Sequence, residues 1–475
     1  MQRATLPGLI LLLFLSMSCG KAAPMPESTT ESATHDSSTP SVAAPTEDLS
    51  IAFYGLVERA RIELEALSGL DLSDLNFSLT DKDAVLDTLM SNLSLQVLDG
   101  DEELTREALA GFAEGMIGIY SMENGDIRIA LENLEGLSEL FEKPGAYSEE
   151  ILFAVIAHEG AHAVADRKYG MVALIESRET SDQLDALNAV FEGHAQWLSR
   201  QVCSNAGFES GFLGMTELTT TTPEMDDPVL RMALEITVQI FAFAYVDGES
   251  FVNALYAAKG EEGIKQAFSS PPSGRNSINH PDWYLDPSKR PESNYQIEDA
   301  LQVFDDFFMD QALATQRIDL DKGMLRAAAS ALPHEDIDRF SSAVLESRAT
   351  IGNNEQSDKQ EFVVAALHQC QSEEQAALYI SLSKQLVAAK AELMKGSAFQ
   401  ITKSDLQKVD RPGFSGFELQ QIVEAFKTET PAQTVLLHQG DLVCEITLLG
   451  IEVAREKLLD LAVDVLNKAV NSHEE

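Results

Sequence analysis

The sequence predicts an α+β protein in which helices far outnumber strands. Ala, Leu and Glu are abundant throughout the 475 residues, and this composition is typical of helical proteins. Several long segments carry apolar residues at helical spacing, whereas only a few short segments have the apolar pattern of strands. We therefore expect a mainly helical domain over residues 49–350 and a small α+β module over residues 351–475.

The start of the chain is expected to direct export rather than to fold. In residues 1–18, Arg3 and the apolar run Leu9–Leu15 are typical of a secretory signal peptide, and the run is too short to span a bilayer. The residues before Cys19 resemble a bacterial lipoprotein cleavage site. A lipid on Cys19 would anchor the protein in the cell envelope, and the Ser- and Pro-rich residues 19–48 would form a disordered tether.

Two helices and a hairpin are expected at the start of the helical domain. Helical patterns cover Leu49–Leu67 and Thr80–Asn92. The segments Met116–Tyr120 and Asp126–Ala130 flank the turn-forming pair Asn124-Gly125, which predicts a hairpin. The edge of such a sheet could hold an extended peptide through main-chain hydrogen bonds, although an ordinary packed hairpin explains the pattern equally well.

The most informative pattern is His158-Glu159-Gly160-Ala161-His162. Ser148 is the expected N-cap and Gly170 the expected C′ residue of an apolar helix of about twenty residues around it. Residues four apart share one face of a helix, so both imidazoles can reach one metal ion, with Glu159 beside that face. A buried helix would carry these polar groups at a cost unless a metal ion paired them. The simpler alternative is a core helix whose histidines bond neighbouring carbonyls.

A third ligand is expected from another element, because a catalytic zinc needs three protein ligands and one open position. The segment from Asp182 to about Val202 has a capping-box start and reads as a helix that carries Glu192 and His194. Glu192 is the predicted ligand. His194 is the competitor, but it points about 200° away from Glu192 around a helix, so the two side chains cannot easily serve one ion.

This arrangement resembles the gluzincin class of zinc metallopeptidases (HExxH...E), in which a glutamate from the following helix completes the metal site. It looks similar to a poorly characterised branch of bacterial and archaeal extracytoplasmic gluzincin-like proteins. Four segments between residues 115 and 285 carry the resemblance: GMIGIY with its hairpin, HEGAHAVAD, DALNAVFEGHA, and the stretch from YVDGESFV to HPDWY. The branch's usual Ser-Thr-Glu before its His-Pro is replaced here by Arg275-Asn276-Ser277.

The resemblance implies a zincin-like fold for residues 49–350 and a peptidase that holds one Zn²⁺ per chain. His158, His162 and Glu192 would be the metal ligands. Glu159 would act as the general base that takes a proton from the metal-activated water.

Supporting groups are also expected around the ion. Tyr245 and His280 are the candidate donors of a hydrogen bond to the oxyanion that forms during hydrolysis. The structural alternative for Tyr245 is a ring at the edge of the core, and that for His280 is a hydrogen bond that fixes its loop. The resembling class often has an aspartate four residues after the ligand glutamate, where this chain has Gln196. We expect Asp166 or Asp185 to orient a ligand histidine instead.

The C-terminal module is expected to serve packing or partner binding rather than a second reaction. Helices between Asp299 and Glu346 would connect it to the helical domain. Cys370 and Cys444 fall in neighbouring elements and form the expected disulfide of an exported chain, which leaves Cys203 free. The predicted elements are a strand over Phe362–His368, a helix from Ser372 to about Lys395, two strands over Thr434–Leu449 around Gly440, and a helix over Ile451–Val470.

The charge of the chain excludes some partners. Lys and Arg number 34 against 77 Asp and Glu, a net charge of −43, so nucleic acids and anionic lipids are poor partners. Membrane contact is expected through the lipid on Cys19 alone. A peptide or protein is the expected substrate.

Three functions remain open at this point. The first is an exported, lipid-anchored zinc peptidase. The second is a non-proteolytic gluzincin-like scaffold that uses a structural zinc and binds partners in the envelope, and the third is a metal-dependent hydrolase of another amide or ester. The presence of Glu159 favours hydrolysis, because a structural zinc needs no base beside an open position.

Overall fold

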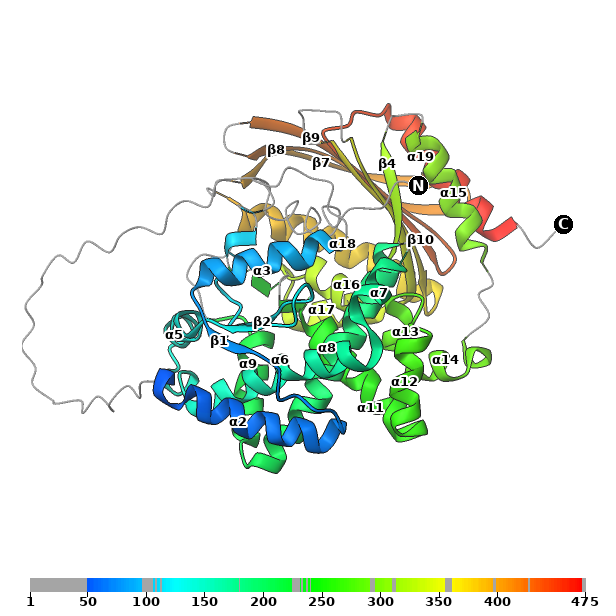
Figure 1. The fold of residues 1–475 in the computed structure, drawn as a ribbon. Helices are drawn as coiled ribbons and strands as arrows, with labels where there is room; N and C mark the ends of the chain where they lie inside the picture. The colour runs from blue at the N-terminus through cyan, green and yellow to red at the C-terminus, as the bar shows by residue number, and fades with distance from the viewer. Residues whose placement is uncertain are drawn as a thin grey trace, which may run out of the picture.

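The structure is a computed structural model of the chain (Figure 1). It describes residues 49–95, 106, 109–111, 113–178, 180–223, 231, 234–235, 238–239, 241–290, 295–309, 313–354, 361–395, 399–425 and 428–471. The expected signal peptide, the tether and Cys19 lie outside the described residues. Among the described helices, none is long and apolar enough to cross a membrane.

Two parts make up the described chain: a helical body (residues 49–290) and a sheet unit (residues 295–471), which lies above the body in Figure 1. The prediction of a mainly helical α+β protein is confirmed. The elements of the helical body are α2 (Leu49–Ser68), β1 (Phe77–Leu79), α3 (Lys82–Leu95), β2 (Gly118–Tyr120), β3 (Ile127–Ile129), α5 (Leu131–Leu140), η1 (Pro144–Ala146), α6 (Glu149–Tyr169), α7 (Met171–Glu176), α8 (Ser181–Ala206), α9 (Glu209–Thr220), η2 (Phe243–Asp247), α11 (Gly248–Lys259), α12 (Glu261–Ser269), α13 (Arg275–Asn279), α14 (Pro281–Leu285) and η3 (Pro287–Lys289).

The sheet unit combines long antiparallel strands with helices on both faces. Its elements are α15 (Ile297–Met309), β4 (Ala314–Asp319), α16 (Lys322–Ala328), α17 (His334–Ser342), β5 (Val344–Asn353), β6 (Phe362–Cys370), α18 (Glu373–Leu393), β7 (Phe399–Arg411), β8 (Phe414–Ala425), β9 (Thr428–Gln439), β10 (Leu442–Leu449) and α19 (Arg455–Asn471).

Helix α6 is the centre of the helical body. The Ser148 hydroxyl accepts a hydrogen bond from the backbone N–H of Ile151, and Gly170 ends the helix in the left-handed conformation, as predicted. Residues 151–165 are all buried and pack against α2, α8 and α9. A glycine lies where α2 approaches α6: a Cβ on Gly160 would lie 2.5 Å from Cδ1 of Leu64, so the Leu64 side chain would have to shift to admit it.

A small three-stranded sheet lies against α6. Its strand order is β1-β3-β2, with β2 antiparallel to β3 and β1 parallel to it. The predicted hairpin is therefore present, and Gly125 occupies its turn with φ 77°. Strand β2 is an edge strand of this sheet and contacts α6.

The larger sheet has seven antiparallel strands in the order β4-β5-β6-β10-β9-β8-β7. Helices α15 and α19 cover one face, and α16, α17 and α18 cover the other. The predicted strands and helices after residue 360 are all present, but β7 and β8 were not predicted. The expected boundary between residues 350 and 351 falls inside β5, and β4 pairs with β5, so the second folded part begins well before residue 351.

The expected disulfide is contradicted. Cys203, Cys370 and Cys444 are all free and buried. Cys370 packs in the cluster beneath α18, whereas Cys444 packs in the cluster beneath α15 and α19. The two thiols lie on opposite faces of the sheet because Cys444 pairs with Leu367, an odd number of residues from Cys370.

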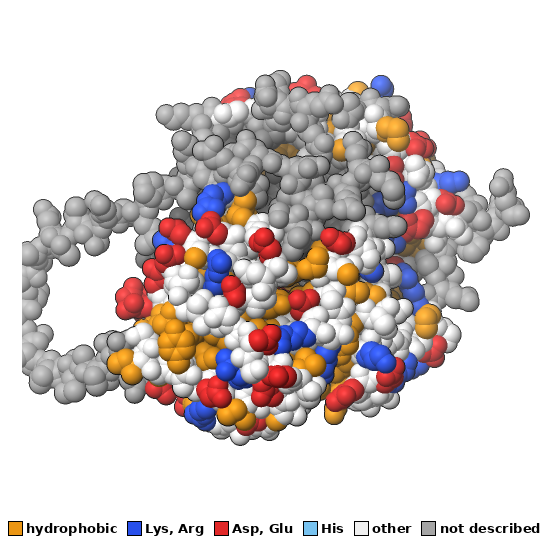
Figure 2. Space-filling model, in the orientation of Figure 1, with side chains coloured by type: hydrophobic (Ala, Val, Ile, Leu, Met, Phe, Trp, Pro, Cys, Tyr) orange, Lys and Arg blue, Asp and Glu red, His pale blue; other side chains and the backbone are white. Residues whose placement is uncertain are grey.

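Charged side chains are spread over the surface. On the face shown in Figure 2, Asp and Glu side chains lie among Lys and Arg side chains rather than in one block. The described acidic side chains on this face therefore form no single patch.

Candidate metal centre

Three side chains from two helices meet in the helical body. His158 and His162 of α6 and Glu192 of α8, called here the metal group, have ligand atoms within 4.8 Å of one another and could hold a metal ion. Nε2 of His158 lies 3.1 Å from Oε2 of Glu192 and 3.2 Å from Nε2 of His162. Nε2 of His162 lies 3.4 Å from Oε2 of Glu192. The structure thus brings the three predicted ligands together.

The spacing of these atoms fits a tetrahedral metal ion. Bonds of about 2.0–2.1 Å at tetrahedral angles place two ligand atoms about 3.3–3.4 Å apart, and the three observed separations lie between 3.1 and 3.4 Å. Two imidazole nitrogens and one carboxylate oxygen form a donor set that zinc accepts with a fourth position open. Other divalent transition metals bind the same donors, so geometry alone does not select zinc.

The electrostatics of the metal group favour a positive charge at its centre. Burial would raise the pKa of Glu192, but the His162 charge and hydrogen bonds with both histidines lower that pKa well below its usual value. Burial opposes a charge on His162, but the carboxylate of Glu192 raises its pKa overall. A metal ion binds the neutral imidazole, so metal binding would compete with protonation of His162.

Glu159 lies beside the metal group, against the edge strand β2. Its side chain is 8% exposed, and a Cβ on Gly118 would lie 2.8 Å from its Cγ. Burial raises the pKa of Glu159, and the nearby His162 and His158 lower it in part. Gly118 leaves the room that the carboxylate occupies, and a carboxylate with a raised pKa at this position has the properties of a general base.

Tyr245 approaches the metal group from the π-helical turn η2. Its ring stacks on the ring of His158 with centroids 5.5 Å apart. Burial, the charges of Glu192 and Glu159, and a hydrogen bond with Glu192 raise the pKa of Tyr245 well above 10. The hydroxyl therefore stays protonated and can donate a hydrogen bond. π-Helical turns occur frequently at functional sites.

A close helix crossing sets the distance between Glu192 and η2. A Cβ on Gly193 would lie 2.2 Å from the backbone of Gly248, and a Cβ on Gly248 would lie 2.2 Å from the carbonyl oxygen of Ala189. Any side chain at either glycine would force α8 and α11 apart. The contact between these two backbones therefore brings Tyr245 within reach of Glu192.

His194 lies in a packing position. Its ring is surrounded by the rings of Tyr169, Trp197 and Phe268, at centroid distances of 6.2, 6.1 and 5.5 Å. Burial is the largest cause that lowers the pKa of His194, to about 3, so the ring is neutral. This placement agrees with the helical phase that favoured Glu192 over His194 as the third ligand.

His280 is not brought to the metal group. It lies between α13 and α14, where its ring stacks on Trp283 with centroids 3.8 Å apart. Burial lowers the pKa of His280, and the charged groups that influence it belong to its own loop region and to the sheet unit. The described contact of the ring is thus a stack on a neighbouring side chain rather than a hydrogen bond, and we assign His280 no part in the reaction.

The expected aspartate partners of the ligand histidines are wrong. Asp166 accepts a hydrogen bond from the hydroxyl of Tyr120 at 2.7 Å, which ties strand β2 to α6 close to Glu159. Asp185 accepts a hydrogen bond from Nη1 of Arg275 at 3.1 Å. Both carboxylates therefore hold elements of the site in place without contacting an imidazole.

The far nitrogens of the two ligand histidines are unpaired. Nδ1 of His158 and Nδ1 of His162 are buried and have no hydrogen-bond partner among the described residues. Oε1 of Gln196, on the turn after Glu192, is also buried without such a partner. Metal-bound histidines usually donate this N–H to an acceptor, so the support of the rings comes mainly from packing.

Several positioning residues were missed by sequence reasoning. They are Gly118, Tyr120, Gly193, Gly248 and Arg275, and all but Gly193 act through tertiary contacts that have no local signal. The exception is Gly193, which stands in a helix interior directly after Glu192. Glycine is unfavourable there by about 1 kcal/mol, which indicates a close approach of another backbone.

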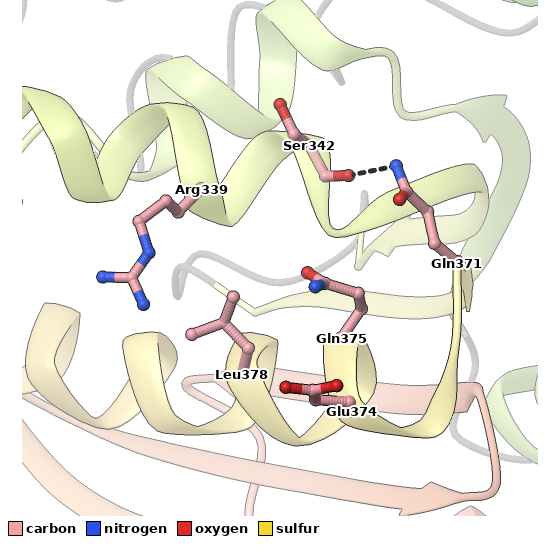
Figure 3. Close-up of a pocket in the computed structure, with 6 residues that line it drawn as sticks. All are labelled: Arg339, Ser342, Gln371, Glu374, Gln375 and Leu378. Carbon is pink, nitrogen blue, oxygen red and sulfur yellow. Dashed lines mark hydrogen bonds between the residues drawn. The ribbon is translucent and has the colours of Figure 1, made fainter.

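A separate pocket of about 450 Å³ lies in the sheet unit. Figure 3 shows it between α17 and the start of α18, where Nε2 of Gln371 donates a hydrogen bond to the carbonyl oxygen of Ser342 at 2.8 Å. Its described lining residues include no His, Cys or Asp, and it lies in the sheet unit rather than beside α6 and α8, so it adds no candidate metal ligand. The lining residues are Arg339, Ser342, Gln371, Glu374, Gln375 and Leu378.

No protein-family model, curated protein or solved structure matches the chain. The metal group is therefore the feature of the chain from which a function can be inferred, because function depends on the geometry and chemistry of a site.

Proposed function

We propose that the protein is a zinc-dependent hydrolase of peptide bonds with a gluzincin-like, zincin-type site. The observation that carries this proposal is the tetrahedral spacing of His158, His162 and Glu192, with the carboxylate of Glu159 on the same helix beside them. A bound zinc ion would polarise the scissile carbonyl and lower the pKa of a coordinated water to about 7.

Glu159 and Tyr245 have complementary tasks in this proposal. Glu159 accepts the proton of the attacking water and later delivers it to the leaving amine, which agrees with its burial and its raised pKa. Tyr245 keeps its proton and donates a hydrogen bond to the developing oxyanion, which agrees with its stacking on His158. The hydroxyl would exchange its partner Glu192 for the oxyanion as substrate arrives.

The edge strand β2 supports a peptide as substrate. It runs past Glu159, since a Cβ on Gly118 would lie 2.8 Å from Cγ of that residue. No described strand pairs with its outer edge, where the carbonyl oxygen of Tyr120 accepts a hydrogen bond from Nδ2 of Asn92 at 2.8 Å. An extended peptide can add to such an edge through main-chain hydrogen bonds, which place its carbonyls at regular spacing along the strand. This mode of binding suits a peptide better than another amide or ester.

A non-proteolytic scaffold with a structural metal is the second candidate. The low exposure of the ligands favours it, since His158 and His162 are 5% and 7% exposed. Glu159 argues for hydrolysis, because a structural ion has no use for a buried carboxylate beside an open position.

The N-terminal segment indicates where in the cell the protein acts. The signal-like residues 1–18 and the lipoprotein-like sequence before Cys19 support action outside the cytoplasm, in the bacterial cell envelope. Labelling with a radioactive fatty acid, compared between the wild type and Cys19→Ala, tests the proposed anchor.

Metal analysis combined with a peptide library tests the proposed activity. The purified protein should contain one zinc per chain and cleave peptides, and a chelator should abolish cleavage until zinc is restored. A protein with one zinc that cleaves no member of the library favours the scaffold.

A further inference from the structure

A buried arginine joins the metal centre to the sheet unit. Arg275, the first residue of α13, is 2% exposed, and its guanidinium contacts groups on three other elements. Nη1 donates to Asp185 of α8 at 3.1 Å, Nε donates to Asp321 of the sheet unit, and Cζ lies 3.6 Å from the ring centroid of Phe243 in η2. A charge this deeply buried stays in place only while its partners surround it.

Two of these partners lie on the elements that carry site residues. Asp185 precedes Glu192 on α8 by seven residues (192 − 185 = 7), which is two helical turns, so both side chains lie on one face of the helix. Phe243 begins the π-helical turn that carries Tyr245 two residues later. One guanidinium therefore contacts both the helix of a metal ligand and the turn of the proposed oxyanion donor.

The third partner belongs to the sheet unit. Asp321 caps α16, where its Oδ1 accepts a hydrogen bond from the backbone N–H of Met324 at 2.8 Å. A second hydrogen bond joins the sheet unit to α8 two residues before Asp321. The backbone N–H of Asp319 donates to Oδ1 of Asp182 at 3.2 Å. The segment from Asp319 to Asp321 thus contacts both Arg275 and α8.

We propose that Arg275 is a positioning residue of the metal centre, which holds α8 and η2 in register against the sheet unit. The sheet unit is then part of the working site, although it supplies no ligand. This inference rests on the proposed metal site and extends it. Loss of the guanidinium would let Glu192 and Tyr245 move relative to His158.

Zinc affinity of matched variants tests the inference. Arg275→Gln removes the charge, Arg275→Lys keeps the charge but cannot bind both carboxylates, and Asp321→Asn keeps the α16 cap while weakening the hold on Arg275. Arg317→Gln is the control: Arg317 also pairs with two carboxylates, Asp305 and Glu298, but these contacts lie within the sheet unit. Affinity is measured by competition with a zinc chelator, together with the melting temperature of each variant.

Arg275→Gln is expected to bind zinc about tenfold to a hundredfold more weakly than the wild type, the range typical of residues that orient ligands. The zinc affinity of Arg275→Lys should lie between those of the wild type and Arg275→Gln. Asp321→Asn should also weaken zinc binding, and Arg317→Gln should not. With a cleaved peptide, kcat should fall in Arg275→Gln while KM changes little. Equal zinc affinity in Arg275→Gln and Arg317→Gln would overturn the inference.

Two further outcomes separate this inference from the proposed function. If Arg275→Gln does not fold, Asp321→Asn decides, and an affinity equal to that of the wild type overturns the inference. If the wild type binds zinc but cleaves no peptide, the proposed function fails while the affinity comparison still decides the role of Arg275. A wild type that binds no zinc overturns both.

Discussion

Gly193 and Gly248 meet backbone to backbone where α8 crosses α11, so closely that a Cβ on Gly193 would lie 2.2 Å from both the carbonyl carbon and the oxygen of Gly248. This contact joins two residues that follow functional groups in the chain, since Gly193 comes after Glu192 and Gly248 lies three residues after Tyr245. The distance between Glu192, the third metal ligand, and Tyr245, the proposed oxyanion donor, therefore depends on the absence of a side chain at both glycines.

Gly193→Ala is expected to destabilise the protein and to weaken zinc binding. The added methyl group must push α11 away from α8, and overpacking of this kind costs about 1–3 kcal/mol. Gly136→Ala is the matched control, because a Cβ there meets nothing within 4 Å and alanine favours the exposed helix by up to about 1 kcal/mol. Urea unfolding and zinc titration measure both effects, and a Gly193→Ala variant as stable as Gly136→Ala would disprove the tight crossing.

Glu192→Ala should release the metal ion, whereas His194→Ala should retain it. The first change removes one of three ligands, and the second opens space among Tyr169, Trp197 and Phe268 without touching the metal group. Zinc per chain after dialysis distinguishes the two variants. We expect a lower melting temperature but a full zinc content in His194→Ala, and the reverse pattern of zinc retention would discard Glu192 as a ligand.

Tyr245→Phe should lower kcat by about 100-fold, the usual loss when one oxyanion donor is removed. The ring remains to stack on His158, so zinc content and KM should change little. Tyr256→Phe, at a side chain on α11 that is 45% exposed, is the control and should leave kcat unchanged. If Tyr245→Phe also leaves kcat unchanged, the hydroxyl has a packing role alone.

The stability of the protein should fall as the pH rises toward 8. Burial, the charge of Asp319 and a hydrogen bond between the two carboxyl groups raise the pKa of Asp182 from 3.8 to about 8, although the backbone N–H of Asp319 opposes this shift. The folded state therefore holds a proton that the unfolded state releases near pH 4. This stabilisation is complete below the unfolded pKa and is lost as the pH rises through about 8. Asp182→Asn should therefore raise the melting temperature relative to the wild type at pH 9 but not at pH 4, and an equal shift at both pH values would contradict the assignment.

The sequence predicted the local parts of the site better than its tertiary parts. The helix around His158 and His162 has its own caps and periodicity, and the phase of α8 was enough to prefer Glu192 over His194. These features depend on residues within a few turns of one another. The crossing of Gly193 with Gly248 and the contacts of Arg275 join residues more than thirty positions apart, and such contacts leave no periodic pattern in the chain.

The failures have the same physical origin. His280 shares a loop with residues that resemble a metallopeptidase segment, but its position depends on how α13 and α14 pack. The pairing of Cys370 with Cys444 was expected from neighbouring elements, yet the register of β6 and β10 turns the thiols to opposite faces. Strand β7 was missed because residues 402–408 are exposed on both faces and show no alternation of apolar residues.

Cleavage of a peptide library by the wild type and by Glu159→Gln, with the zinc content of both, tests the central claim most directly. The change keeps the shape of the side chain beside Gly118 but removes the base, so one zinc per chain should remain while kcat falls by about 100-fold or more. A Glu159→Gln variant that retains its zinc and cleaves peptides as fast as the wild type would contradict the account.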